Sequence, residues 1–99
     1  MLVATEFGRT AAANGTGGTD HGTGSVAMLI GGAVSGGRVI ADWPGLATSA
    51  LYEARDLRPT ASLDGLIAGA AGESLRLDPA HVGRAVFAGA SPLTGLVTA

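Results

Sequence analysis

Seventeen glycines in a chain of 99 residues, set against four aromatic side chains, constrain what this sequence can fold into. Glycine loses more backbone entropy on folding than any other residue, and few large side chains are present to offset that cost by burial. A chain of this length builds one small domain with a modest core. The composition therefore favours a piece of a larger domain over a complete small one.

Charge and cysteine content exclude several classes of protein. The formal net charge is −2, and the six basic residues are all arginines scattered along the chain, so no basic stripe is present for a nucleic-acid backbone. The absence of cysteine excludes disulfides and thiolate metal sites. No apolar run of about eighteen residues occurs, so we expect no membrane span. Residues 1–6 lack the basic start of a signal peptide; if the parent protein is exported, we expect its signal to lie upstream.

Short apolar runs predict strands in the first half of the chain. Residues 1–5 and 25–30 are rich in β-compatible side chains, and residues 38–41 form a third short run. The glycine-bounded turn at residues 31–37 predicts a hairpin between the second and third runs. A brief strand is also expected at residues 51–53.

Two helices are expected in the second half of the chain. Apolar residues recur at helical spacing over residues 61–75, with Thr60 or Ser62 as the N-cap. Three glycines within this stretch weaken the helix by about 1 kcal/mol each relative to alanine, so it depends on packing. A second, shorter helix begins with Asp78 as N-cap and a proline at the first helical position, and it ends near Gly89.

The glycine-rich loop at residues 8–24 holds the strongest chemical signal. A loop of seventeen residues is long, and loops of this length are usually functional or disordered. Asp20 and His21 stand side by side in it, and a carboxylate oxygen with an imidazole nitrogen suits Zn²⁺, Mn²⁺ or Fe. The flanking glycines would let the backbone bend so that both side chains reach one ion. Taken alone, such a pair is also typical of an aspartate that caps a turn next to a solvent-exposed histidine.

Other polar residues near this loop have two interpretations each. Glu6 follows the first expected strand, where open α/β sheets gather their ligands, and the planar fork of Arg9 suits an anionic substrate oxygen. The two residues could equally form an ordinary salt bridge. Residues 14–18 are similar to a phosphate cradle of backbone N–H groups but lack the lysine and the spacing of a P-loop. We expect the second histidine, His81, on a helix surface, and no residue is marked as a nucleophile.

A series of motifs extends over nearly the whole chain. In order, they are TEFGRT at 5–10, NG at 14–15, GTDHG at 18–22, GGAV at 31–34, GGRV at 36–39, DWPGL at 42–46, LY at 51–52 and RDL at 55–57. This series resembles the C-terminal part of a bacterial family catalogued as domain of unknown function 1501, a member of the alkaline phosphatase and sulfatase superfamily. The ordered series is far more specific than the Asp-His pair alone.

The resemblance implies the C-terminal part of an alkaline-phosphatase-like, three-layer α/β/α domain, here short strands followed by two helices. It implies that Asp20, His21 and Glu6 bind a divalent metal, zinc by preference, and that a full-length parent holds a second metal. It places Arg9 against an anionic phosphate or sulfate ester. In that superfamily one metal activates a hydroxyl nucleophile, and both stabilise charge on the phosphoryl or sulfuryl group. The nucleophile and the first carboxylates come from an N-terminal half that this sequence does not contain.

The sequence thus predicts a C-terminal fragment, or a reading frame begun at an internal methionine, of a metal-dependent hydrolase-like domain. Its partner would be the rest of the parent domain, in a periplasmic or exported location by resemblance. We expect the isolated chain to supply metal ligands without the nucleophile and therefore to be inactive on phosphate and sulfate esters. One alternative is a catalytically inactive domain of the same fold that binds a partner or a glycan. Another is a poorly folded fragment with no activity of its own.

Overall fold

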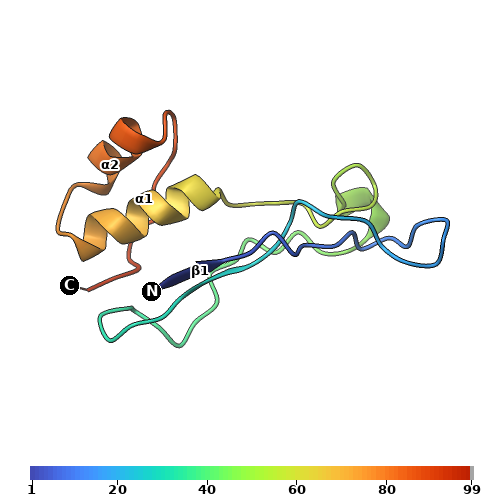
Figure 1. Cartoon of the computed structure of the whole chain (residues 1–99), viewed down its shortest axis with the longest axis horizontal. Helices are drawn as coiled ribbons and strands as arrows, with labels where there is room; N and C mark the ends of the chain where they lie inside the picture. Colours follow the sequence, from blue (N-terminus) through green and yellow to red (C-terminus); the bar gives the residue numbers. More distant parts are fainter. Residues whose placement is uncertain (99) are drawn as a thin grey trace. The chain divides into compact units, whose positions relative to one another are not determined.

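The computed structural model describes residues 1–98 and is a small mixed structure in which two short strands precede two α-helices. The first strand and both helices are labelled in Figure 1. The elements are β1 at Leu2–Ala4, β2 at Ala27–Leu29, a 3₁₀ turn at Thr48–Ala50, α1 at Leu63–Ser74 and α2 at Pro79–Val86. The chain divides into two compact units. Unit 1 contains residues 1–2, 29–40 and those from 61 onward, and unit 2 contains residues 3–28 and 41–60. The order of strands and helices confirms the general α/β prediction.

The two strands pair as an antiparallel sheet of order β1-β2. The Met1 nitrogen donates to the Ile30 carbonyl at 2.7 Å, and the Ile30 N–H donates back to the Met1 carbonyl at 2.9 Å, a reciprocal exchange characteristic of antiparallel pairing. The predicted hairpin between residues 25–30 and 38–41 is wrong, because β2 pairs with β1 and residues 38–41 form no strand. After β2 the chain pairs elsewhere: Val34 forms an antiparallel bridge with Val97.

Both helices begin at the caps that the sequence predicts. The Ser62 hydroxyl accepts a hydrogen bond from the Gly65 N–H at 3.3 Å, and the Asp78 carboxylate accepts one from the Ala80 N–H at 3.1 Å. These side chains satisfy N–H groups that have no partner within the helix. α1 and α2 contact each other within unit 1 (Figure 1).

The three glycines of α1 form a packing face. Gly65, Gly69 and Gly72 are buried, and a Cβ at Gly65 or Gly69 would overlap the backbone of residues 91–93. A Cβ at Gly72 would lie 2.7 Å from the Cα of Pro79, at the start of α2. The residues that weaken the isolated helix therefore allow two neighbouring segments to approach it closely.

The C-terminal segment closes the core of unit 1. The Glu73 carboxylate of α1 accepts hydrogen bonds from three successive backbone N–H groups, those of residues 95–97, at 2.9, 2.8 and 3.3 Å. These contacts bury Leu96, which is 3% exposed. The buried apolar residues are few, two leucines and two alanines: Leu51, Ala68, Ala70 and Leu96. No large side chain within residues 1–98 is fully buried, which agrees with the modest core expected from composition.

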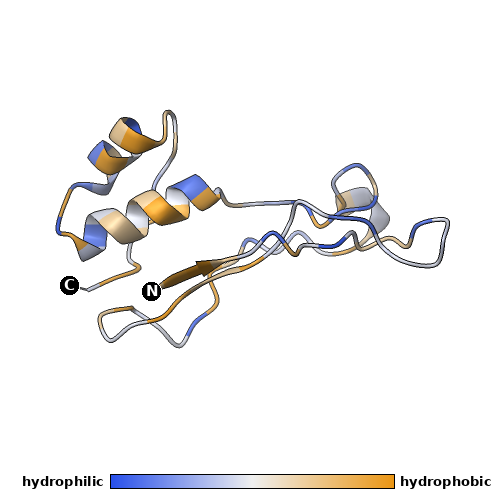
Figure 2. Ribbon diagram, in the orientation of Figure 1, coloured by the Kyte–Doolittle hydropathy of each residue, from blue (hydrophilic) through white to orange (hydrophobic). Residues whose placement is uncertain are grey.

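Apolar residues occur along the ribbon of both units (Figure 2). Many of their side chains remain exposed. Phe7 is 77% exposed, Trp43 63% and Val39 90%. Because only buried apolar area contributes hydrophobic stabilisation, these side chains add little to the stability of the chain by itself. The helices formed by residues 1–98 are all too short or too polar to cross a membrane.

Candidate functional site

The Asp20–His21 pair lies in unit 2, where two segments of the chain meet backbone to backbone. The Gly22 N–H donates to the Gly8 carbonyl at 2.7 Å, and the Thr10 N–H donates to the Asp20 carbonyl at 3.0 Å. A Cβ at Gly22 would lie 2.8 Å from the Arg9 carbonyl carbon. The φ of Gly22 is not positive, so this glycine permits close approach of two backbones rather than the sharp bend expected from the sequence.

The His21 ring is oriented by the backbone of Glu6. His21 Nε2 lies 2.6 Å from the Glu6 carbonyl oxygen. A carbonyl only accepts hydrogen bonds, so Nε2 is the nitrogen that donates here, and in the neutral imidazole Nδ1 then carries the lone pair. Metal-binding histidines almost always donate their other ring N–H to a carbonyl, a carboxylate or water. Glu6 therefore meets His21 through its main chain, in an arrangement that suits a ligating histidine.

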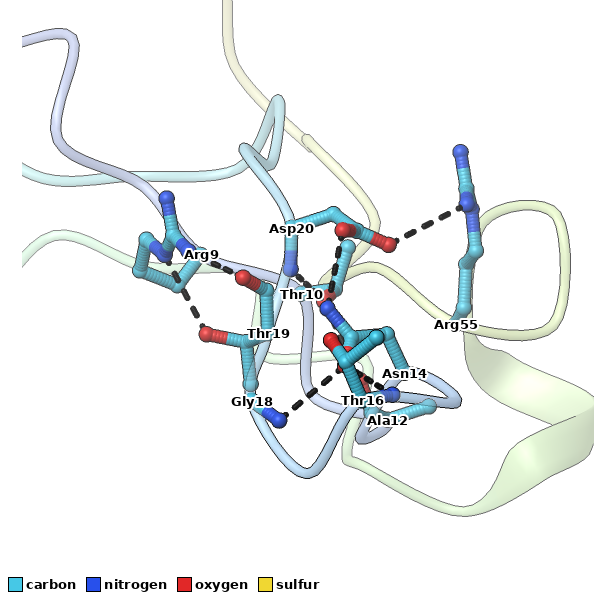
Figure 3. A network of polar contacts seen from close by, with 9 residues as sticks. All are labelled: Arg9, Thr10, Ala12, Asn14, Thr16, Gly18, Thr19, Asp20 and Arg55. Atoms are coloured by element: carbon cyan, nitrogen blue, oxygen red, sulfur yellow. Dashed lines mark hydrogen bonds and ion pairs between the residues drawn. The ribbon is translucent and has the colours of Figure 1, made fainter.

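The Asp20 carboxylate is held by two neighbours (Figure 3). Asn14 Nδ2 donates to Asp20 Oδ1 at 3.1 Å, and Arg55 Nη1 lies 3.7 Å from Asp20 Oδ2. The Asp20 side chain is half exposed. Asn14 Oδ1 in turn accepts the N–H groups of Thr16 and Gly18, each at 3.0 Å. Because these N–H groups are already bonded, the loop at residues 14–18 does not offer them to a phosphate.

Arg9 contacts Thr19 (Figure 3). Its Nε donates to the Thr19 hydroxyl at 3.1 Å, and its Nη2 donates to the Thr19 carbonyl oxygen. Within residues 1–98 Arg9 forms no salt bridge with Glu6. The second interpretation of these two residues, an ordinary ion pair, is therefore wrong for the described chain. The guanidinium is exposed and keeps Nη1 free of hydrogen bonds to the described residues, as an anion-binding group requires.

The donor chemistry of this site fits a divalent metal, but the donor number is incomplete. An aspartate oxygen and a histidine nitrogen with a free lone pair are ordinary ligands of zinc. The two side chains have different neighbours: Asp20 contacts Asn14 and Arg55, whereas the His21 ring contacts the Glu6 carbonyl. No group of three or more His, Cys, Asp or Glu side chains that could hold an ion occurs among the described residues.

Asp56 is a site residue that the sequence reasoning missed. Its side chain is buried, and its Oδ2 accepts a hydrogen bond from the Thr23 N–H at 2.5 Å. Thr23 is two residues beyond His21, and Asp56 directly follows the Arg55 that faces Asp20. The only signal in the sequence was the RDL motif at residues 55–57, whose place beside the loop no local pattern reveals.

The turn that carries Arg55 and Asp56 leads to a stability prediction. Ala54 has a φ of 60°, in the left-handed region that costs an L residue roughly 1–2 kcal/mol and costs glycine almost nothing. We expect Ala54→Gly to raise the free energy of unfolding by about 0.5–1 kcal/mol in urea titrations. Ala47→Gly, at a residue with φ of −60°, is the matched control and should lower it. A loss of stability in Ala54→Gly would contradict the left-handed turn.

Comparison with known proteins identifies one family. The profile of a family described as "Protein of unknown function (DUF1501)" matches residues 1–87, which include the whole site and both helices. Comparisons with curated proteins and with solved structures give no significant match.

Proposed function

The chain belongs to the DUF1501 family of proteins of unknown function, and from this membership we propose that it is the C-terminal part of a metal-dependent hydrolase-like domain. The proposal assigns it to the three-layer fold of the alkaline phosphatase and sulfatase superfamily, with phosphate or sulfate esters as substrates. The chain supplies metal ligands, and the rest of the parent domain supplies the nucleophile. The observation that carries the proposal is the 2.6 Å contact of His21 Nε2 with the Glu6 carbonyl, which leaves Nδ1 as a lone-pair donor.

Each side chain of the site has a role in this proposal. Asp20 and His21 are ligands, and the Asn14 amide orients the Asp20 carboxylate. Glu6 orients His21 through its carbonyl, while its exposed carboxylate is the third proposed ligand. Arg9 binds an anionic oxygen of the ester. A bound divalent ion, zinc by preference, supplies Lewis-acid stabilisation of the negative charge on the ester.

Exposed apolar surface supports the need for the rest of the parent domain. A sheet of two strands is marginally stable by itself in water. Large apolar side chains on and beside the strands remain exposed, namely Met1, Val26, Met28 and Ile30. Unit 1 also has an open, mainly apolar hollow that includes Leu29, Val34, Ala70 and Val97. A further strand and a covering layer from the parent domain would bury these groups.

The second candidate function is that of a catalytically inactive domain of the same fold, which binds a partner or a glycan. It is favoured by the neighbours of Asp20, because Arg55 and Asn14 are also the ordinary partners of a surface carboxylate. In that case the site has no use for a metal. Metal affinity therefore separates the two candidates.

Calorimetric titration of the chain with Zn²⁺ tests the proposed function. We expect measurable binding that falls by about tenfold or more in Asp20→Ala and in His21→Ala, because each change removes a ligand from a set that is already small. His81→Ala is the matched control, since it removes the other histidine, exposed on α2, and should leave the affinity unchanged. Equal affinity in the unchanged chain and in both site variants would reject the metal site.

A further inference from the structure

A buried carboxylate outside the proposed ligand set lies beside the backbone that follows His21. Asp56 is 4% exposed, and its Oδ1 has no hydrogen-bond partner within residues 1–98. Buried polar atoms are nearly always paired, and an unpaired buried carboxylate oxygen is costly. A residue chosen for packing alone would not be an aspartate here, so the carboxylate calls for another explanation.

The contacts of the carboxylate show what it holds. Asp56 Oδ2 accepts the Thr23 N–H at 2.5 Å, and a Cβ at Gly22 would lie 2.6 Å from Asp56 Oδ1. Both oxygens therefore lie against the two residues that follow His21. A side chain at residue 22 would collide with the carboxylate, so only glycine fits between Asp56 and the Arg9 backbone.

The turn that carries Asp56 is both fixed and strained. The Tyr52 N–H donates to the Asp56 carbonyl at 2.8 Å, and the Asp56 N–H donates to the Tyr52 carbonyl at 3.0 Å. Between them, Glu53 and Ala54 have φ values of 53° and 60°. Non-glycine residues keep such a left-handed backbone conformation only where the surrounding structure enforces it, and they cluster at functional sites. Arg55 of the same turn faces Asp20 at 3.7 Å, so one turn contacts the loop at both Asp20 and Thr23.

We propose that Asp56 is a positioning residue for the Asp20–His21 ligand pair. Its carboxylate fixes the backbone at Gly22 and Thr23 and thereby sets the direction of the His21 ring. The role requires an acceptor oxygen at this place, which asparagine keeps and alanine lacks. The inference rests on the proposed function for its effect on metal binding, whereas the position of the loop can be measured without any metal.

NMR hydrogen exchange and Zn²⁺ calorimetry on the full chain test this role. In Asp56→Ala we expect the Thr23 amide to exchange at least about tenfold faster, because its acceptor is gone. We expect Zn²⁺ affinity to fall by about tenfold or more, as it does when an outer-shell partner of a ligand is lost. Asp56→Asn should keep both quantities within about threefold of the unchanged chain, because it keeps the acceptor.

A stability control separates positioning from general loosening. Leu51→Ala removes a buried side chain of the same unit, 7% exposed, and leaves the Asp56 carboxylate in place. It should lower the thermal midpoint but leave the Zn²⁺ affinity of the folded chain unchanged. An equal loss of affinity in Leu51→Ala and Asp56→Ala would overturn the positioning role.

The two hypotheses fail in different ways. If the unchanged chain binds no Zn²⁺, the proposed function fails, and the Thr23 exchange rate still decides the role of Asp56. If that rate is the same in Asp56→Ala as in the unchanged chain, the positioning role is wrong. Should Asp56→Ala not fold, Asp56→Asn decides alone: retained Thr23 protection supports the role, and its loss overturns it.

Discussion

Gly69→Ala is expected to lower the free energy of unfolding by about 3 kcal/mol or more, although the same change in an exposed helix raises it by about 1 kcal/mol. The reason is the segment that crosses α1. A Cβ at Gly69 would overlap the Leu93 carbonyl oxygen and lie 2.8 Å from its carbonyl carbon. A backbone cannot rotate away as a flexible side chain does, so α1 and residues 91–93 would have to separate. That separation would also break the hydrogen bond from the Leu93 N–H to the Gly65 carbonyl, at 3.0 Å.

Urea unfolding followed by circular dichroism measures this effect. Gly32→Ala is the matched control, because Gly32 belongs to the same unit and a Cβ there would meet no atom within 4 Å. The control should change the stability by about 0.5 kcal/mol or less. If Gly69→Ala were as stable as the unchanged chain, residues 91–93 would not lie on α1.

The helices were predictable because their signals are local. Ser62 and Asp78 cap the helices that follow them, and a cap acts on N–H groups only two or three residues away. Helix propensity, a local rule, predicts that the glycines of α1 weaken the helix. Their value lies in close contact with residues 91–93 and Pro79, which helix propensity does not register.

Strand pairing was predicted less well, because it depends on which distant segments meet. Residues 38–41 have suitable β-forming side chains, yet β propensity mainly reflects packing against neighbours and does not select a partner. The chain after β2 pairs with the C-terminal segment, through Val34 and Val97. Nothing in the residues near Val34 marks Val97 as its partner.

The candidate site was predictable as a pair of ligand types but not as an arrangement. Asp20 and His21 stand out because their side chains carry the chemistry. Glu6 contacts His21 through a carbonyl, a group that every residue has, so its identity gave no signal. Asp56 reaches the loop across a sequence separation of 33 residues, and its burial is visible only in the folded chain.

Glu73→Ala is expected to lower the free energy of unfolding by about 2 kcal/mol, as measured by urea unfolding. The carboxylate accepts three backbone N–H groups of residues 95–97, the shortest from Leu96 at 2.8 Å. Hydrogen bonds to a charged acceptor are stronger than neutral ones. Because Glu73 is only partly buried, solvent reduces the free energy that these hydrogen bonds contribute. Alanine would leave these N–H groups without their acceptor and release Leu96 from the core. Glu73→Gln keeps one acceptor oxygen and should lose less.

The same contacts make the stability of unit 1 depend on pH. The pKa of Glu73 lies below its ordinary value of 4.5, mainly because its carboxylate accepts the Leu96 N–H. The N–H groups of Gly95 and Val97 and the charge of Arg38 also lower this pKa, while burial opposes the shift. Because the folded pKa is the lower one, the stabilisation is complete above the unfolded pKa and is lost as the pH falls through the folded value. The difference in free energy of unfolding between the unchanged chain and Glu73→Gln should therefore shrink below about pH 4.5. Glu53→Gln, which alters an exposed glutamate, is the control for nonspecific charge effects. A difference that stays constant between about pH 7 and pH 3 would show that Glu73 does not hold residues 95–97 as a carboxylate.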